Sequence, residues 1–584
     1  MKYIAIDIES IGVSLKQGLV WVIAVNDGTK CYEFESCFGL KRKDIPAIFI
    51  KQMEDPKICK VIHNASFDGA YLERWLGIKV RNLWCTMLAD YCINGYSPPP
   101  KKRRKDGTTT YSPAELALQE DYGTALKFVL PRYGFPSPNK DITKNFIDRP
   151  KGIAWTREEK EYWRGDIKYL LKLQRAQEFV LRRDKQLEVA LLEFKTVEKI
   201  ISMRIRGVNI NQKLWKDIAK KNEKEYNRRI AKLPKAVENW GSEKQVKAFF
   251  RTKGVDIPSY KYLDEILYET RNPILKDFMS AQEIRKNVTT YGMNWFTDGF
   301  IHEDGMLRPE IYQDKDTGRM SYKTPNLQQL KKEGEHRSAI IPHKGRIFDI
   351  GDFSGQELGI MAAMSEEKLW IDAMLRGDDV HGLTASLLYE RDWDQGYKRG
   401  CSFPKKCNCP EHQHLRENAK TLNFMLAYGG GPKKFGEKTG LSFNESKLVI
   451  KRYKKIIPNI TKCLDDNATS AIQNGECYSA DPYQRRRLLL ADEEWHIANQ
   501  GKNSPIQAAG ANMLKLSMIS MPESIPIALV VHDEIVVEPL IRDGVKAAKV
   551  LKQVMEKSAD FITGIKGLIK VHPRLSYSLS KPKH

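Results

Sequence analysis

The sequence predicts a multidomain protein of the α/β class. Its 584 residues, with a mass of 67.2 kDa, exceed what a single hydrophobic core organises, so several domains are expected. Residues 1–190 alternate short apolar strands with helical patterns, which is typical of an α/β domain. Two later strand segments, RIFDIGDFSG and PIALVVHDEIVVE, flank a long helical stretch at residues 366–475. The second half therefore predicts a sheet domain with a helical insertion.

The charge balance indicates a polyanionic partner. The chain has 96 Lys and Arg residues against 74 Asp and Glu, a net charge of +22, which favours nucleic acid over an anionic membrane or a merely solvated basic surface. Residues 185–300 are helical, charged and rich in Lys, and long helices with basic faces suit an arm that grips a nucleic-acid backbone. The basic segment 97–110 predicts a loop near DNA, with a nuclear-localisation signal as the alternative.

Composition also excludes several classes of protein. Hydrophobic content of 41% and charged content of 29% exclude a disordered or collagenous chain. Mean hydropathy is −0.50 and we find no apolar run of about 18–20 residues, so no membrane span is expected. The first residues resemble a β-strand rather than a signal peptide, and the ten cysteines show no regular pairing. These features predict a cytoplasmic protein.

Four acidic residues near the N-terminus form a candidate metal site. Asp7 and Glu9 lie two apart on a strand and so leave the same face, while Asp68 follows the segment HNASF. Asp166 lies on a predicted helix, four residues after Tyr162 and on the same face. Such a set could hold two Mg²⁺ or Mn²⁺ ions about 3.5–4 Å apart and align a water for attack on a phosphodiester. The alternative is a scatter of surface acids.

A second acidic group lies in the C-terminal half. Asp352 ends a strand in GDFSGQELGIMA, and Glu357 opens the segment that follows. The apolar pair ALVVHDEIVV places His532, Asp533 and Glu534 at a tight turn. Because adjacent acids inside a buried hairpin need a compensating charge, a bound cation is expected there.

Between these acids lies the predicted helix HLRENAKTLNFMLAYGGG. Arg416, Lys420, Phe424 and Tyr428 recur every four residues and so form one stripe. The two cations could take a triphosphate, and the two aromatic rings could stack on a base and a sugar. An ordinary amphipathic helix is the alternative.

The segment RGCSFPKKCNCPEHQHLR, just before this helix, holds five potential metal ligands within 14 residues, namely Cys401, Cys407, Cys409, His412 and His414. Three cysteines and one histidine would hold a structural Zn²⁺ tetrahedrally and brace a small insertion. The spacing is not a standard zinc-finger pattern, and a loop with reduced thiols is the alternative.

Eight ordered motifs resemble known families. D-x-E, N-x2-F-D and Y-x3-D resemble the motifs of DEDD-type, DnaQ-like 3′–5′ exonucleases. DFSGQEL, RENAKTLNFMLAYG and VHDE resemble motifs A, B and C of family A DNA polymerases, the class of bacterial DNA polymerase I, and segments 317–330 and 503–512 match two further family segments. The resemblance implies an RNase H-like exonuclease domain followed by a right-hand polymerase. The expected boundaries are exonuclease 1–190, thumb 191–305, palm 306–365 and 497–584, and fingers 366–496.

The resemblance also implies a role for each motif residue. In the exonuclease, metal is bound by the carboxylates of Asp7, Glu9, Asp68 and Asp166. Tyr162 positions the attacking water, and the frayed strand is held by Asn64 and Phe67. In the polymerase, Asp352 and Asp533 hold the two metals, with Glu534 near the second. The residues implied to contact primer and template are Arg319, Asn326, Gln328, Asn503, Gln507 and His532.

The same resemblance implies a nucleotide site. Arg416, Lys420 and His381 bind the triphosphate, and Lys420 also acts as general acid toward pyrophosphate. Phe424 lies beside the sugar, Tyr428 lies at the base of the nascent pair, and Glu357 is the steric gate against a 2′-hydroxyl. The three arginines at 485–487 suggest contact with the DNA backbone, with a solvated turn as the alternative.

The implied function is template-directed addition of dNTPs to a primer 3′ end, with 3′–5′ proofreading and two Mg²⁺ or Mn²⁺ ions in each active site. The expected partners are primer–template DNA, dNTPs, a replicative helicase and a single-strand binding protein, and the enzyme is expected to be monomeric. We find no 5′-nuclease segment before the exonuclease, and the helical arm is short. These features favour a phage replicative enzyme in the host cytoplasm.

Two other classes of function agree less well with the sequence. A single-subunit RNA polymerase shares related A, B and C motifs, but Glu357 and the N-terminal exonuclease motifs argue against it. A DNA-binding protein with decayed catalysis is disfavoured because all six carboxylates that the two chemistries need are retained: Asp7, Glu9, Asp68, Asp166, Asp352 and Asp533.

Overall fold

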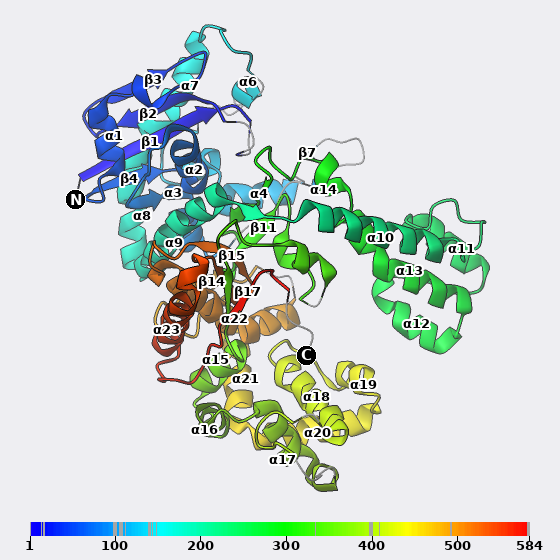
Figure 1. Ribbon diagram of the computed structural model, residues 1–584. Helices are drawn as coiled ribbons and strands as arrows, with labels where there is room; N and C mark the ends of the chain where they lie inside the picture. The colour runs from blue at the N-terminus through cyan, green and yellow to red at the C-terminus, as the bar shows by residue number, and fades with distance from the viewer. Residues whose placement is uncertain are drawn as a thin grey trace. The chain divides into compact units, whose positions relative to one another are not determined.

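The computed structural model divides into two compact units (Figure 1). It describes residues 2–12, 15, 18–96, 102–103, 109–110, 113–137, 142, 144–147, 149–332, 334–395, 401–407, 409–490 and 493–580. Most of the basic segment 97–110 lies outside the described residues, so its predicted role stays a prediction. The first unit contains Met1–Arg206, Glu310–Tyr322 and Asp349–Leu575, and the second contains Gly207–Pro309, Lys323–Phe348 and Ser576–His584.

A mixed five-stranded sheet forms the N-terminal part of the first unit, with strand order β3-β2-β1-β4-β5. Strand β1 pairs antiparallel with β2 and parallel with β4, so it lies at the centre of the sheet. The strands are β1 (Lys2–Ser10), β2 (Val20–Asn26), β3 (Cys31–Glu35), β4 (Ile58–Ile62) and β5 (Leu83–Cys85). Because β2 and β4 are apolar along almost their whole length, they are buried on both faces.

Helices pack around this sheet, and the N-terminal acidic residues lie where a strand meets them. The helices are α1 (Ala47–Glu54), α2 (Ala65–Leu76), α3 (Thr86–Asn94), α4 (Pro113–Tyr122), α5 (Leu126–Arg132), α6 (Lys144–Ile147), α7 (Arg157–Lys168), α8 (Leu170–Arg183) and α9 (Leu187–Arg206). Helix α7 begins with a capping box in which Thr156 and Glu159 satisfy each other's backbone amides. Helix α9 continues past residue 190, the expected end of the exonuclease domain, and packs against α2.

A four-stranded sheet forms the second part of the same unit, with order β15-β16-β12-β17, in which β16 pairs antiparallel with both β15 and β12. Its strands are β12 (Phe348–Asp352), β15 (Ile527–Val531), β16 (Glu534–Val537) and β17 (Arg574–Ser576), and the helices beside it are α15 (Gln356–Ser365), α22 (Glu494–Ser520) and α23 (Gly544–Thr563). Gly351 permits close packing, because a Cβ there would lie 2.7 Å from the sulfur of Met555 on α23. This packing fixes β12, the strand that carries Asp352.

The helical insertion predicted for residues 366–475 is confirmed. It contains α16 (Lys368–Arg376), α17 (Val380–Gln395), α18 (Pro410–Met425), α19 (Pro432–Thr439), α20 (Phe443–Ile456) and α21 (Pro458–Asn474). A short antiparallel pair follows, β13 (Glu476–Tyr478) with β14 (Arg486–Leu488). Two small strands, β10 (Glu310–Tyr312) and β11 (Ser321–Lys323), form a separate two-stranded sheet.

The second unit is mainly helical. It contains α10 (Gln212–Ile230), α11 (Glu243–Thr252), α12 (Leu263–Thr270), α13 (Pro273–Thr289) and α14 (Asn294–Thr297), with the short pair β8 (Val208–Asn209) and β9 (Met306–Leu307). Trp240, Phe250 and Phe278 are buried in its apolar core, and Trp215 stacks on Trp295 with ring centroids 4.0 Å apart.

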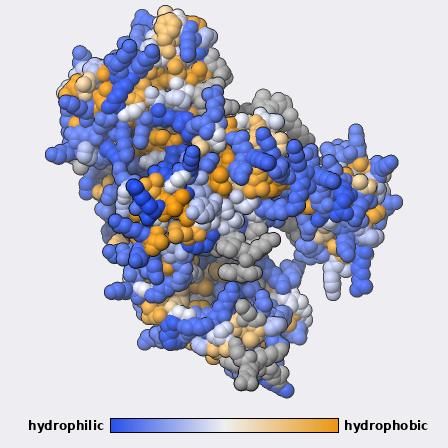
Figure 2. Space-filling model, in the orientation of Figure 1, coloured by the Kyte–Doolittle hydropathy of each residue, from blue (hydrophilic) through white to orange (hydrophobic). Residues whose placement is uncertain are grey.

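The face of the molecule in Figure 2 is largely hydrophilic, in keeping with a mean hydropathy of −0.50. Within the described parts of the chain, none of the helices is both long and apolar enough to span a bilayer.

Candidate active sites

The structure brings three of the four N-terminal acidic residues together. Asp7 and Glu9 on β1 and Asp166 on α7 have carboxylate oxygens within 4.8 Å of one another. Glu9 and Asp166 are buried, and Asp7 is half-buried. Three carboxylates this close repel one another unless a cation lies between them. Hard oxygen ligands in such a group fit Mg²⁺ or Mn²⁺.

Asp68 lies beside this group without belonging to its closest set. It lies in the first turn of α2, and its Oδ1 accepts a hydrogen bond of 3.2 Å from the amide of Ile8. Because Ile8 stands between Asp7 and Glu9, this bond ties the start of α2 to the strand that carries both acids.

Three other predicted exonuclease residues lie on these two helices or directly before one of them. Tyr162 is buried on α7, one turn before Asp166, and packs against Phe146 with ring centroids 5.6 Å apart. Asn64 precedes α2 in the left-handed conformation with φ 59°, and Phe67 packs against Tyr71 at 4.7 Å.

The carboxylates predicted for the polymerase site lie at one end of the second sheet. Strands β15 and β16 form a hairpin in which Val531 faces Glu534, so His532 and Asp533 make a two-residue turn. Exposed His532 takes a left-handed conformation with φ 56°. Asp352, the last residue of β12, lies directly opposite Glu534. The three acids thus lie on neighbouring strand ends, and their oxygens fit hard divalent cations.

Glu357 is held from two sides. Its carboxylate accepts hydrogen bonds of 3.1 and 3.2 Å from the hydroxyl of Tyr428 and one of 2.9 Å from Arg319. Burial, reinforced by the Glu357 charge, raises the pKa of Tyr428, so its phenol stays protonated and donating. These contacts immobilise Glu357 in the first turn of α15.

The predicted stripe on α18 is correct for three of its four residues. The helix ends at Met425, and Tyr428 lies in the turn that follows, because the glycines at 429–431 do not continue the helix. Its amide still donates to the carbonyl of Phe424 at 3.3 Å.

The two cations on α18 have different surroundings. Arg416 pairs with Asp379 through bonds of 2.5 and 3.0 Å, and Asp379 was not among the predicted residues. Lys420 is about half exposed and lies 3.2 Å from Glu417. Lys420 is therefore the more accessible of the two cations.

A hydrogen-bonded chain that sequence reasoning missed orients His381. Asn423 on α18 donates to Nδ1 of His381 at 2.8 Å, and the Tyr453 hydroxyl donates to the Asn423 carbonyl oxygen at 2.9 Å. Asn423 lies inside the predicted helix but outside the stripe of residues that recur every four positions. The sequence pattern therefore gave no signal of this role. Burial, with Arg416 adding to it, lowers the pKa of His381 to about 4. The ring is therefore neutral near pH 7.

The residues implied to contact DNA are distributed over both units. Asn503 and Gln507 are half-buried and lie four residues apart on α22, so they share a face. Arg319 is exposed. In the second unit Asn326 caps a short 3₁₀ helix, Leu327–Gln329, by accepting a bond of 3.0 Å from the amide of Gln328.

The basic cluster at 485–487 does not act as predicted at its first residue. Arg485 is buried and pairs with Glu193 of α9, so it is not available to a DNA phosphate. Arg486 pairs with Glu476, and Arg487 bonds Ser504. Arg485 therefore stabilises the fold, and contact with the DNA backbone stays a prediction for Arg486 and Arg487.

The Cys and His residues of the insertion separate into two groups. Cys401, Cys407, Cys409 and His412 come together, whereas His414 is exposed on α18 and lies outside the group.

Comparison with known proteins agrees with this architecture. The family model "DNA polymerase family A" matches residues 208–573, and the model "3′-5′ exonuclease" matches residues 1–97. The POL domain of Pol1 from M. smegmatis, solved in complex with DNA primer-template and dNTP, has a TM-score of 0.77 at 18% identity and covers 99% of this chain and 95% of that chain. The fold is thus a right-hand polymerase with an N-terminal exonuclease domain. The chain belongs to DNA polymerase family A.

Curated relatives include DNA polymerase I of Streptococcus pneumoniae (strain R6), 29% identical over 305 residues, which are 49% of this chain and 33% of that protein. DNA polymerase I of Aquifex aeolicus is 24% identical over 545 residues, covering 85% of this chain and 83% of that protein. The matched region spans about a third of the length of the pneumococcal relative.

Proposed function

We propose that this chain is a template-directed DNA polymerase that adds dNTPs to a primer 3′ end and removes mispaired ends with a 3′–5′ exonuclease. The observation that carries the proposal is the presence of two separate carboxylate groups on two different sheets. One contains Asp7, Glu9 and Asp166, and the other contains Asp352 and Glu534 with Asp533 beside them.

In the polymerase site, Asp352 and Asp533 would hold two Mg²⁺ or Mn²⁺ ions, with Glu534 next to the second. When bound, these ions neutralise phosphate charge and lower the pKa of the primer 3′-hydroxyl. Arg416 and Lys420 bind the triphosphate, and Lys420 gives a proton from Nζ to the departing pyrophosphate.

The sugar and base of the incoming nucleotide meet the other side of this site. Phe424 contacts the sugar, Tyr428 lies at the base of the nascent pair, and Glu357 excludes a 2′-hydroxyl. The bonds from Arg319 and Tyr428 support this role, because a gate must keep its position to reject a substrate by steric clash.

In the exonuclease site, Asp7, Glu9, Asp68 and Asp166 would hold the metal ions, and the Tyr162 hydroxyl orients the attacking water. Removal of a nucleotide is again phosphoryl transfer, so the protein mainly positions groups and neutralises charge. Asn64 and Phe67 hold the unpaired primer end.

The proposal extends to domains, partners and setting. The boundaries are exonuclease 1–190, thumb 191–305, palm 306–365 and 497–584, and fingers 366–496. Primer–template DNA contacts Arg319, Asn326, Gln328, Asn503, Gln507 and His532. We further propose a monomer that replicates a phage genome in the host cytoplasm together with a helicase and a single-strand binding protein.

One assay tests the proposed function. A labelled primer on a longer template is incubated with the purified chain and Mg²⁺, with and without dNTPs. Extension with dNTPs and shortening without them are expected, and ribonucleotides in place of dNTPs should give little extension. A chain that binds the duplex but neither extends nor shortens the primer would contradict the proposal.

A further inference from the structure

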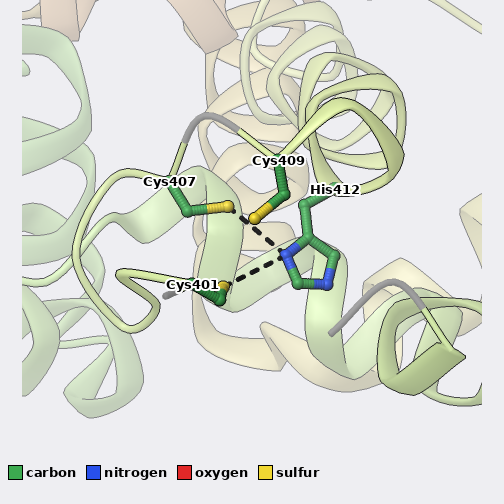
Figure 3. Close-up of side chains that lie close together, drawn as sticks. All are labelled: Cys401, Cys407, Cys409 and His412. Carbon is green, nitrogen blue, oxygen red and sulfur yellow. Dashed lines mark hydrogen bonds between the residues drawn. The ribbon is translucent and has the colours of Figure 1, made fainter. Parts of the chain in front are cut away.

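Three cysteines and one histidine converge between α17 and α18 (Figure 3). The sulfurs of Cys401, Cys407 and Cys409 and a ring nitrogen of His412 all lie within 4.8 Å of one another. We propose that this group is a structural zinc site with a Cys₃His ligand set, separate from both phosphoryl-transfer sites.

Two distances within the group are close to those of a tetrahedral zinc site. Nδ1 of His412 lies 3.3 Å from the sulfur of Cys407 and 3.5 Å from that of Cys401. With Zn–N of about 2.0–2.1 Å and Zn–S of about 2.3 Å, a tetrahedron has an N–S edge of about 3.6 Å. These two distances are therefore already close to the spacing that the metal requires, and the remaining ones are below 4.8 Å.

Hydrogen bonding alone explains this convergence poorly. An imidazole nitrogen has one in-plane lone pair, so it accepts one well-directed thiol hydrogen. Here two thiols approach the same Nδ1, and a third sulfur lies beside them. A cation at the centre of the group would contact all four atoms at once.

The ring of His412 is fixed in the tautomer that a metal needs. Its Nε2 lies 2.8 Å from the carbonyl oxygen of Trp393, and because a carbonyl only accepts, Nε2 carries the hydrogen. The lone pair of Nδ1 then faces the sulfurs, as Figure 3 shows. Zinc-binding histidines are typically oriented by such a bond from the second nitrogen. The ring is fully buried and stacks on the ring of Trp393, with ring centroids 4.0 Å apart and an angle of 6° between the ring planes. This packing prevents the ring from turning away.

The chemistry of the ligands selects the metal and its role. Thiolates and imidazole favour Zn²⁺ over Mg²⁺ or Ca²⁺, and four protein ligands leave no open position for substrate, so the site is structural. Three thiolates and Zn²⁺ sum to one negative charge. Cys409 is the N-cap of α18 and His412 lies in its first turn, so this charge lies at the positive end of the helix dipole.

The position of the site indicates what the metal stabilises. The local apolar cluster has only Ala385, Trp393 and Ala419 as buried members among the described residues, a small core that a metal can supplement. His412 also begins the helical face that continues, at intervals of four residues, through Arg416, Lys420 and Phe424. Fixing His412 therefore fixes the rotation of α18 about its axis, and with it the proposed triphosphate-binding face.

The first test is metal content. The full chain is purified without chelator and without a polyhistidine tag, and metals are measured by mass spectrometry. About one zinc per chain is expected. Less than a tenth of an equivalent, or iron in place of zinc, would overturn the proposal.

Two matched pairs of variants locate the metal. His412→Asn and Cys407→Ser should each lose at least nine-tenths of the zinc, whereas His414→Asn and Cys463→Ser should keep it, because neither residue belongs to the group. Equal zinc in His412→Asn and His414→Asn would overturn the assignment. Metal content is measured on the protein itself, so this result does not depend on either proposed activity.

A measurement on the unmutated protein covers the case in which the ligand variants fail to fold. The zinc is exchanged for Co²⁺, whose visible absorption reports coordination geometry. Intense bands of a tetrahedral thiolate site, together with thiolate-to-cobalt charge transfer, are expected. Weak bands typical of octahedral oxygen ligands would overturn the proposal.

Discussion

The side-chain amide of Asn423 donates a hydrogen bond to Nδ1 of His381 across 2.8 Å. The hydroxyl of Tyr453 fixes which way that amide faces, since it donates to the amide oxygen at 2.9 Å. An Nδ1 that accepts leaves the proton of the neutral ring on Nε2. His381 can therefore donate a hydrogen bond to a phosphate while carrying no charge.

This arrangement predicts a pH signature for Asn423→Asp. Burial lowers the pKa of His381 to about 4, so the wild-type ring stays neutral and extension shows no His381 titration between about pH 6 and pH 8. A carboxylate in place of the amide would favour the protonated ring and raise that pKa. The variant should show a new step in the pH profile of extension within this range, measured as kcat/KM for dNTP.

Asn423→Leu is the uncharged counterpart. It removes the hydrogen bond without adding a charge, so KM for dNTP should rise about tenfold, the effect of about 1.4 kcal/mol, with the shape of the pH profile unchanged. If both variants matched the wild type at every pH, the Asn423–His381 contact would have no role in nucleotide binding.

The two activities should separate by mutation. Asp7→Asn replaces one member of the closest exonuclease group, so primer shortening should fall by about a thousandfold or more while extension stays within about twofold. Asp533→Asn should do the reverse. Both rates are followed on one gel. The control is Glu161→Gln, which changes an exposed acid of α7. Parallel loss of both activities in either variant would contradict two independent sites.

The proposed role of Glu357 as a steric gate predicts a change of sugar specificity. Glu357→Ala opens the space that the carboxylate fills, so incorporation of rNTPs relative to dNTPs should rise about a hundredfold. Tyr428→Phe removes only the hydroxyl that donates to Glu357, and its effect on the same ratio should be about tenfold or less. Competition between one dNTP and its rNTP on a single template measures both. An unchanged ratio in Glu357→Ala would place the gate elsewhere.

The sequence predicted which acids come together because acids at such positions disturb a local pattern. Asp533 and Glu534 interrupt an apolar hairpin, and Asp7 and Glu9 alternate on a strand, so each pair shows in its own segment. The end of α18 was also readable, since the glycines at 429–431 follow Tyr428 directly. The interval of four residues continues to Tyr428, however, and so predicts a helix that includes it.

Contacts between distant segments could not be predicted in this way. Arg485 and Glu193 are 292 residues apart, and Lys515 and Glu193 are 322 apart, so the arginine cluster gave no sign of its buried partner. The sequence gave no reason to prefer His412 over His414 as a metal ligand. They lie two apart on a helix, so their side chains leave different faces. Which of them meets the cysteines depends on the rotation of α18, and tertiary packing sets that rotation.

Glu193 predicts a large loss of stability on substitution. It is fully buried on α9 and accepts hydrogen bonds of 2.5 and 2.7 Å from Lys515. It also forms an ion pair with Arg485. Glu193→Gln would leave two buried cations without their counter-charge, so the free energy of unfolding should fall by about 3–5 kcal/mol. Thermal unfolding measures this, and Glu161→Gln, whose partner Arg157 is almost fully exposed, should change it by less than about 1 kcal/mol.

The ion pairs of Glu193 with Lys515 and Arg485 also make the stability of the fold depend on pH. Burial alone would raise the pKa of Glu193, but Lys515 and Arg485 outweigh it and hold that pKa below its ordinary value. A carboxyl with a lowered pKa contributes stability above its unfolded pKa of about 4.3 and loses that contribution as the pH falls below it. The difference in melting temperature between wild type and Glu193→Gln should therefore shrink below about pH 4. A constant difference down to about pH 3 would show that the charge of Glu193 is not its cause.

Asp349 predicts the opposite pH dependence. It is fully buried in β12, and within the described residues neither carboxylate oxygen has a hydrogen-bond partner. Burial raises its pKa to about 7, so the folded chain holds this proton at pH values where the unfolded chain has released it. Stability therefore falls as the pH rises from about 4 to about 7, by up to about 4 kcal/mol, and stays level above that range.

Asp349→Asn should remove this effect without changing the size of the side chain. The variant should melt at a higher temperature than the wild type at about pH 8, and the difference should shrink steadily to nothing near pH 4. Asp121→Asn, at an exposed acid of α4, should show no such trend. Because Asp349 lies three residues before Asp352 on a strand, its side chain leaves the opposite face, and extension should stay within about twofold. A gain in melting temperature that is the same at pH 4 and pH 8 would mean that folding does not raise the pKa of Asp349, and its burial would then have no effect on the pH dependence of stability.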